Sequence, residues 1–354
     1  MSKQLLEAKT TAPTRGPAIQ KRSPMYQLAS LFARVGALPL ILLALILFFA
    51  ISAPVFFTTQ NLSTLATQSV FLLLVATAQL LVLIAGGFDL SVGANIGLTS
   101  VASATVMAAV YGGIDEYSSI SLVWGIAIAL LVGGTVGLAN GIGVAVLKVN
   151  PFIITLASSG IVAGLAIIVS KGQQITGLPK VFTQVISAGT VAGIPWLLVL
   201  SVPIVAAVYL LLSWTKFGRH LYAIGGNSTA ANVAGVKVTR YLVITYTLAG
   251  LLVGLAGWLL TARVTSGQPS LGTALTMQSV TAALIGGASL YGGRGGVGGL
   301  VMGAGFIMLL TNGMNLLRMD TNTQSIAVGV ALVLAVVIDR ARERTRVWVR
   351  AHTP

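Results

Sequence analysis

The stretch that decides the fold class is "GGTVGLANGIG" at residues 133–143, because five of its eleven residues are glycines inside an apolar segment. Helices in lipid associate through close packing, and small residues let two backbones approach each other. The stretch "GGVGGLVMGAG" at 295–305 has the same character. Together they predict helices that pack as a tight bundle inside a membrane.

The composition supports this class. Of the 354 residues, 56% are hydrophobic and only 8% are charged, and the mean hydropathy is +0.94. Soluble domains carry about 25% charged residues, so this chain has too few to cover a soluble surface. We therefore predict an all-α integral membrane protein. The absence of cysteine excludes disulfides and thiolate-bound metals. His220 and His352 lie in basic segments outside the predicted spans, so no metal site is expected.

The number of membrane spans follows from the apolar segments. A helix that crosses a bilayer needs about 20 predominantly apolar residues. About ten segments meet this condition, although the eighth and the tenth are short. The predicted spans are 36–57, 62–84, 90–111, 120–146, 151–170, 195–213, 241–262, 274–290, 297–317 and 323–339.

The basic residues predict how these spans are oriented. If the N-terminus lies inside, 17 of the 21 Lys and Arg residues fall in inner segments, as expected for cytoplasmic loops. Both termini are then cytoplasmic. The predicted parts are a disordered basic tail (1–35), a transmembrane domain (36–340) and a basic C-terminal tail (341–354). The net charge of +14 reflects this topology, so we expect contact with membrane lipid and no nucleic-acid partner.

The polar side chains inside the predicted spans are almost all neutral. Ion-driven transporters carry acids or bases within the bundle, whereas Asp89 lies only at a predicted boundary. Neutral amides either form interhelical hydrogen bonds or line a path for a neutral, hydroxyl-rich solute. The residues of the possible translocation path are Gln68, Gln79, Asn95 and Asn140.

The sequence has no nucleotide-binding loop of its own. Neither G-x-x-x-x-G-K-[ST] nor any Gly-Lys dipeptide occurs. The glycine cluster "GGASLYGGRGGVGG" (286–299) lacks the lysine and predicts a tight turn with close helix packing. No cluster of acids, serines and histidines suggests catalysis. We expect a conduit without enzymatic activity or cofactor, driven by another polypeptide.

The longest inner loop, 214–240, holds a very short predicted helix. Asn227 or Ser228 can accept backbone N–H groups at its start, and Gly235 can adopt the left-handed conformation that ends it. Such a short helix is marginal in water, so it needs packing from elsewhere. Its alanines and Val233 offer a small apolar surface, which fits either a partner's groove or the chain's own bundle.

The outer loop "KGQQITGLPKVFTQVISAG" (171–189) predicts a second short helix. Pro179 can open it, and apolar residues then follow at helical spacing, including Phe182 and Val185. Two interpretations remain open. This helix is the surface on which a solute-binding protein docks, or it seals the outer end of the bundle.

Five stretches resemble one known family. They are "AGGFDLSVG" (85–93), "GLANG" (137–141), "NPFIITLAS" (150–158), "GRHLYAIGGNSTAANVAGVKV" (218–238) and "LIGGASLYGGRGGVGG" (284–299). Their order and spacing resemble the membrane permease subunit of ribose-type sugar ABC importers over roughly residues 40–340. The resemblance implies an inner-membrane permease of about ten helices that moves a monosaccharide and pairs with a second copy or a close relative.

The resemblance also implies the partners and the coupling site. The implied partners are a cytoplasmic ABC ATPase, which binds the ATP, and a periplasmic or extracellular solute-binding protein. The implied location is a bacterial inner membrane. The loop then carries the coupling helix that docks on the ATPase. The matching coupling residues are Gly218, Arg219, Ala223, Gly225, Gly226, Asn227, Ala230, Ala231 and Gly235.

One stretch departs from the family pattern. The segment before the eighth span usually carries an acid, whereas "ALTMQSVTAALIGG" (274–287) has none. A role tied to that carboxylate therefore does not carry over. The same architecture with another cargo remains an alternative, such as a furanone signal, a nucleoside or a branched-chain amino acid. A self-sufficient secondary transporter and a membrane-embedded enzyme are less consistent with the residues.

Overall fold

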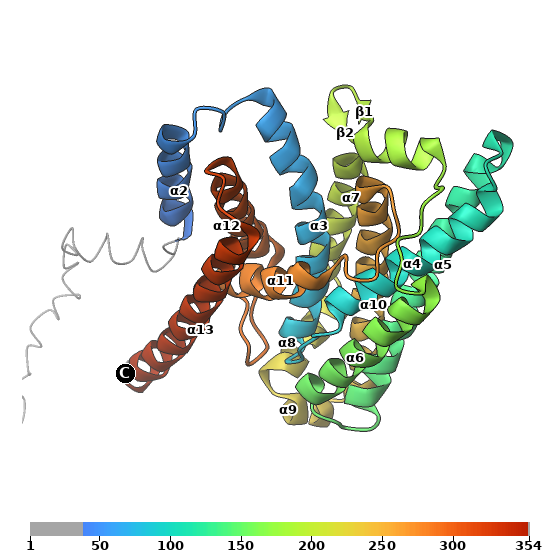
Figure 1. The fold of residues 1–354 in the computed structure, drawn as a ribbon. Coiled ribbons are helices and arrows are strands. Elements are labelled where there is room, and N and C mark those ends of the chain that lie inside the picture. Colours follow the sequence, from blue (N-terminus) through green and yellow to red (C-terminus); the bar gives the residue numbers. More distant parts are fainter. Residues whose placement is uncertain (1–37, 353–354) are drawn as a thin grey trace, which may run out of the picture.

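The computed structural model describes the backbone of residues 38–352 and the side chains of residues 38–337. The predicted N-terminal tail (1–35) lies outside the described residues. Apolar helices dominate the described chain (Figure 1). In order, the elements are α2 (Leu38–Ser52), α3 (Thr59–Ile84), α4 (Val92–Tyr111), η1 (Asp115–Tyr117), α5 (Ser118–Ala145), α6 (Pro151–Ser170), η2 (Val181–Ile186), β1 (Thr190–Val191), β2 (Ile194–Pro195), α7 (Trp196–Trp214), α8 (Lys216–Gly226), α9 (Ser228–Val233), α10 (Val238–Val264), α11 (Thr273–Ile285), α12 (Val297–Leu316) and α13 (Thr321–His352).

Each of the ten predicted spans coincides with a helix. Within the described residues, seven helices are long and apolar enough to cross a membrane: α3, α4, α5, α6, α7, α10 and α12. The other three positions hold shorter apolar helices, Leu38–Ser52, Thr273–Ile285 and Thr321–Val337. The all-α membrane class is therefore confirmed, and the number of crossings stays a prediction.

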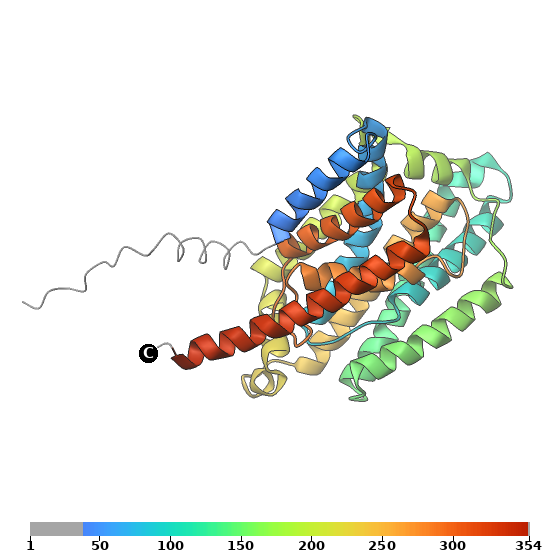
Figure 2. The same ribbon diagram turned by 60° about the vertical axis from the view of Figure 1, so that its left-hand side comes forward.

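The bundle is built around α3. Most of α3 is buried, whereas little of α6 is buried. α10, α11, α12 and α7 all pack against α3, and its buried leucines divide between two adjoining core clusters. α11 lies across the bundle rather than along it (Figure 1). Figure 2 shows that the C-terminal end of the long helix α13 extends away from the bundle.

The two ends of the bundle differ. α9 and the turn between α5 and α6 lie at one end, and the β1–β2 hairpin lies at the other (Figure 1). Lys148 belongs to the first end and Lys180 precedes η2 at the second. The short hairpin pairs Val191 with Ile194 and was not expected from the sequence.

The glycine stretch 133–143 packs α5 against α10, the most extensive helix pair among the described residues. A Cβ added to Gly137 would overlap with the carbonyl oxygen of Tyr246, and one added to Gly250 would overlap with that of Gly133. Gly254 lies equally close to Ala129. The sequence-based expectation of direct backbone contact is confirmed here.

The loop before α7 corrects one expectation about the outer surface. A short helix does follow Pro179. The N–H groups of Phe182 and Thr183 donate to the Pro179 carbonyl oxygen. Phe182, however, is 0% exposed and packs on Trp258 with ring centroids 4.9 Å apart. A docking role for Phe182 is therefore wrong, because its ring fills the core. Val185 is exposed, and docking there stays a prediction.

Candidate functional site

The segment 214–240 forms two helices, not one. Thr215 caps α8 by accepting the Gly218 N–H group at 3.3 Å. Phe217, Leu221 and Ile224 recur at helical spacing on one face of α8. Leu221 and Ile224 are buried, and Phe217 packs against the same core cluster as Leu221. The sequence-based interpretation missed α8, although this spacing and the Thr215 cap predict it.

The short helix α9 has the ends that the sequence predicts. Asn227 accepts the Ala230 N–H group at 2.9 Å. Gly235 has a φ of +85° and ends the helix, while the Val236 N–H group donates to the Ala231 carbonyl oxygen at 3.0 Å. This closure matches a glycine-terminated helix.

The two faces of α9 differ in exposure. Ala231 is 5% exposed and rests on the chain's own bundle, whereas Val233 is 85% exposed. The predicted coupling residues Arg219, Ala223, Gly226, Asn227, Ala230 and Gly235 are exposed. Gly218 is buried against Leu212. A partner can therefore reach the Val233 face, while Ala231 anchors the helix from within.

Three segments meet at a glycine junction, which we define as Gly86, Gly225, Gly292 and Gly293. It joins the end of α3, the end of α8 and the loop between α11 and α12. The Gly293 N–H group donates to the Ile84 carbonyl oxygen at 2.9 Å. Gly292 and Gly293 have φ values of +83° and +69°, which glycine adopts readily. The predicted tight turn at 286–299 is confirmed.

Two further features lie beside the junction. Tyr222 on α8 donates from its hydroxyl to the Gly295 carbonyl oxygen at 2.8 Å, which ties α8 to the same loop. A cavity of about 420 Å³ opens there, and Gly226, Asn227 and Tyr291 are among its lining residues. This region therefore connects the α8–α9 segment with the loop that leads from α11 into α12.

Asn140 belongs to a buried network near the α3–α4 loop. Its amide donates to the Ser91 hydroxyl at 2.8 Å, and Ser91 donates in turn to Asp89 at 2.6 Å. The Ser91 N–H group also donates to Asp89, at 2.8 Å. Burial raises the pKa of Asp89 to about 6, and the two hydrogen bonds from Ser91 oppose this rise. The network ties α5 to the loop before α4.

Other amides also join helices. Asn95 donates to the Gly133 carbonyl oxygen at 3.4 Å and accepts from the Thr99 hydroxyl at 3.3 Å. Asn61 and Asn312 exchange reciprocal hydrogen bonds of 3.2 and 2.9 Å between α3 and α12. For Asn95 and Asn140, these contacts support a role in hydrogen bonds that join segments of the bundle rather than a place along a solute path.

Gln79 is different. It is 0% exposed, and neither its amide nitrogen nor its amide oxygen has a hydrogen-bond partner among the described residues. A buried, unpaired polar group carries a desolvation penalty, and no hydrogen bond between described residues offsets this penalty for Gln79. Gln68, on the same helix, is only half-buried. Of the four predicted path residues, Gln79 is the one that is fully buried and has no hydrogen-bond partner among the described residues.

A hydroxyl-lined pocket of about 300 Å³ lies between α4, α6 and α11. It has the size of a small ligand pocket. Four of its lining residues carry hydroxyl groups, and the Thr276 hydroxyl also accepts the Gly93 N–H group at 3.0 Å. The hydroxyl residues are Ser159, Ser270, Thr273 and Thr276. The sequence-based interpretation missed this group, because its members are far apart in the chain.

Comparison with known proteins matches this architecture to transport proteins. The family described as "Branched-chain amino acid transport system / permease component" matches residues 61–337. The ribose import permease protein RbsC of Bacillus subtilis is 37% identical over 302 residues, which cover 85% of this chain and 91% of that protein. No solved structure matches.

Two other relatives also have names that refer to sugars. The D-allose transport system permease protein AlsC of Escherichia coli is 29% identical and covers 93% of this chain and 98% of its own length. The fructose import permease protein FrcC of Rhizobium meliloti is 34% identical and covers 89% of this chain and 86% of its own length. Since the family match spans most of the helical bundle, the chain belongs to the family of the branched-chain amino acid transport system permease component.

Proposed function

We propose that this chain is the permease subunit of an ABC importer that moves a monosaccharide across a bacterial inner membrane. The observation that carries the cargo class is the hydroxyl-lined pocket. Ser159, Ser270, Thr273 and Thr276 offer donors and acceptors to a solute rich in hydroxyl groups. The ribose, allose and fructose permeases among its relatives support the same class.

The family description also names branched-chain amino acids as a cargo. An amino acid brings a carboxylate and an ammonium group, and each needs a partner when it leaves water. The residues that line the pocket are all described, and none is charged. The pocket therefore favours a neutral solute over a zwitterion.

The driving force comes from a partner ATPase. In this proposal, the exposed face of α9 around Val233 docks on the ATPase, and α8 carries its movement to the glycine junction. The loop 286–296 connects that junction to α11, whose Thr276 lines the hydroxyl pocket. One continuous series of contacts thus joins the predicted ATP-driven end to the predicted solute path.

The remaining parts of the assembly follow from the charges and the exposed surfaces. The end that carries α9 and Lys148 is the cytoplasmic end, with both termini on that side. A solute-binding protein delivers the sugar at the β1–β2 end. A second permease copy or a close relative completes the pore, and lipid covers the rest of the apolar surface.

Reconstitution in liposomes tests this function. The permease is combined with its ATPase and solute-binding protein, and uptake of radiolabelled ribose, allose, fructose and valine is followed. We expect ATP-dependent uptake of one of the sugars and no uptake of valine. Uptake of valine alone would assign the amino-acid cargo. Accumulation by the isolated permease under an ion gradient would contradict the dependence on an ATPase.

A further inference from the structure

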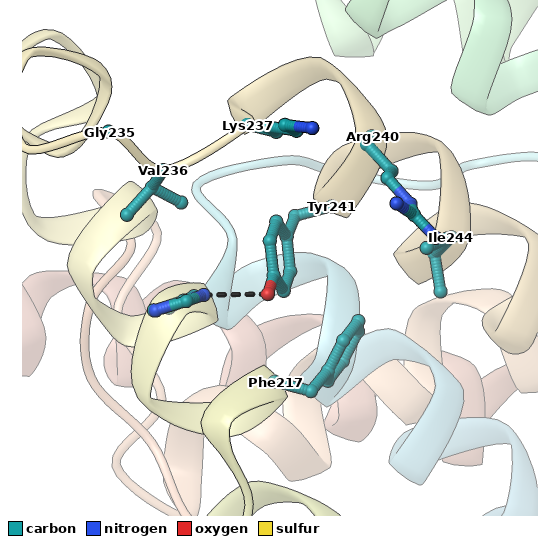
Figure 3. A pocket seen from close by; sticks show the side chains of 8 residues that line it. Phe217, Gly235, Val236, Lys237, Arg240, Tyr241 and Ile244 are labelled. Atoms are coloured by element: carbon teal, nitrogen blue, oxygen red, sulfur yellow. Dashed lines mark hydrogen bonds between the residues drawn. The ribbon is translucent and has the colours of Figure 1, made fainter.

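A pocket of about 440 Å³ lies between α8 and the start of α10, next to the end of α9 (Figure 3). It is separate from the hydroxyl-lined pocket, and the transport proposal does not use it. Its lining combines basic, aromatic and aliphatic side chains. They are Phe217, His220, Gly235, Val236, Lys237, Arg240, Tyr241 and Ile244.

One part of this pocket is positively charged. Lys237 and Arg240 are exposed, and within residues 38–337 neither forms an ion pair. The four acids with described side chains are Asp89, Asp115, Glu116 and Asp320. The first turn of α10 adds the positive end of a helix dipole. A hydrogen bond of 2.6 Å between His220 Nδ1 and the Tyr241 hydroxyl holds these two lining side chains in place. This part suits an anion.

The other part of the pocket is apolar. Phe217 packs against Tyr241 with ring centroids 5.5 Å apart, and Figure 3 shows Tyr241 between Lys237 and Phe217. Ile244 continues this surface along α10. Trp214, at the end of α7, is 75% exposed just before α8. Exposed tryptophan at the end of an apolar helix is typical of the level of the lipid headgroups.

We propose that this pocket binds an acidic phospholipid, with its phosphate at Lys237 and Arg240 and the start of its acyl chains along Phe217 and Ile244. Basic pockets between membrane helices bind anionic headgroups in this way. A soluble phosphate would use only the charged part, whereas a lipid uses both. The bound lipid holds α8 to α10 and so steadies the two helices that flank α9.

Lipid retention by the purified permease tests this proposal without any transport assay, so its failure is distinguishable from failure of the transport function. Phosphatidylglycerol and phosphatidylcholine are offered in detergent, and bound lipid is counted by native mass spectrometry. The test variant is Lys237→Gln/Arg240→Gln. The matched control is Lys148→Gln/Lys171→Gln, which removes the same charge at exposed positions outside the pocket and outside the predicted coupling residues.

We expect wild type to retain phosphatidylglycerol in preference to phosphatidylcholine. The test variant should lose affinity by about fivefold for each cation removed, and the control should match wild type. Equal retention by test variant and control would overturn the proposal. Displacement by millimolar inorganic phosphate would assign the pocket to a soluble anion instead. Unchanged retention with lost copurification of the ATPase would assign it to an acidic side chain of that partner.

Discussion

The backbone of Gly225 lies so close to the carbonyl oxygen of Ile84 that a Cβ atom on residue 225 would overlap with it. The same oxygen accepts the Gly293 N–H group at 2.9 Å. Gly225 therefore holds α8, α3 and the 286–296 loop together, and no side chain fits between them.

The first prediction concerns this contact. Gly225→Ala should destabilise the folded permease by about 1–3 kcal/mol, since overpacking forces backbone shifts. Gly226→Ala is the matched control, because a Cβ on Gly226 meets no atom within 4 Å. Thermal unfolding in detergent measures both. Equal unfolding temperatures for the two variants would contradict the prediction, because they would show that the glycine junction accommodates a Cβ atom at residue 225 without loss of stability.

The second prediction concerns the exposed face of α9. Val233→Asp should abolish stimulation of the ATPase by loaded solute-binding protein, because it places a charge on the apolar surface that we propose docks on the ATPase. The unfolding temperature should stay unchanged, since Val233 is 85% exposed. Asn232→Asp adds the same charge at an exposed position without loss of apolar surface. Replacing Ala231 is a poor test of docking, because that residue is buried. Normal stimulation in Val233→Asp would refute docking at this face.

The third prediction concerns Gln79. Gln79→Leu should raise stability by about 1–3 kcal/mol, since it removes a buried amide without partners, and it should slow solute uptake. Gln68→Leu on the same helix is the control, with little expected gain in stability. A stability increase with normal uptake would remove Gln79 from the solute path. A loss of stability would mean that the amide is paired within the fold.

The fourth prediction concerns the hydroxyl-lined pocket. Thr276→Val keeps the shape of the side chain and removes its hydroxyl, so initial uptake should fall by roughly three- to tenfold, the worth of one hydrogen bond. Thr281→Val is the control on the same helix, because the Thr281 hydroxyl bonds to its own helix at Met277. Equal uptake by the two variants would exclude Thr276 from the path.

The fifth prediction concerns pH. Burial raises the pKa of Asp89 from 3.8 to about 6, so the folded state binds more protons than the unfolded state between these values. Stability should therefore fall as the pH rises through this window, by an amount on the order of 3 kcal/mol at most. Asp89→Asn should remove this slope. Glu116→Gln, a change at an exposed acid, should leave the slope in place, and unfolding temperatures across the window distinguish the two.

Sequence patterns of short range predicted the fold well. Within the described residues, apolar runs located the seven helices that are long enough to cross a membrane and the three shorter apolar helices. The Asn227 and Gly235 signals located both ends of α9, because caps depend on adjacent residues. Glycine spacing predicted the contact between α5 and α10. The order of the motifs also predicted the family correctly.

The parts that depend on three-dimensional proximity were harder to predict. Phe182 and Val185 belong to the same apolar stripe, but Phe182 is buried against Trp258, a residue distant in sequence, whereas Val185 is exposed. Ser159 and Thr276 meet in one pocket from segments over a hundred positions apart. The amide of Asn140 is paired and that of Gln79 is not, although nothing in their local sequence distinguishes them.

The crossing of backbones at Gly225 and Ile84 has a mechanical consequence. Long side chains at a contact can absorb small displacements by changing rotamer. No side chain lies between the two backbones at this crossing. A displacement of α9 would therefore be transmitted to the 286–296 loop almost without loss. The end of the permease that carries α9 would then respond as a stiff lever, so that displacements shorter than a side chain would suffice to move the 286–296 loop.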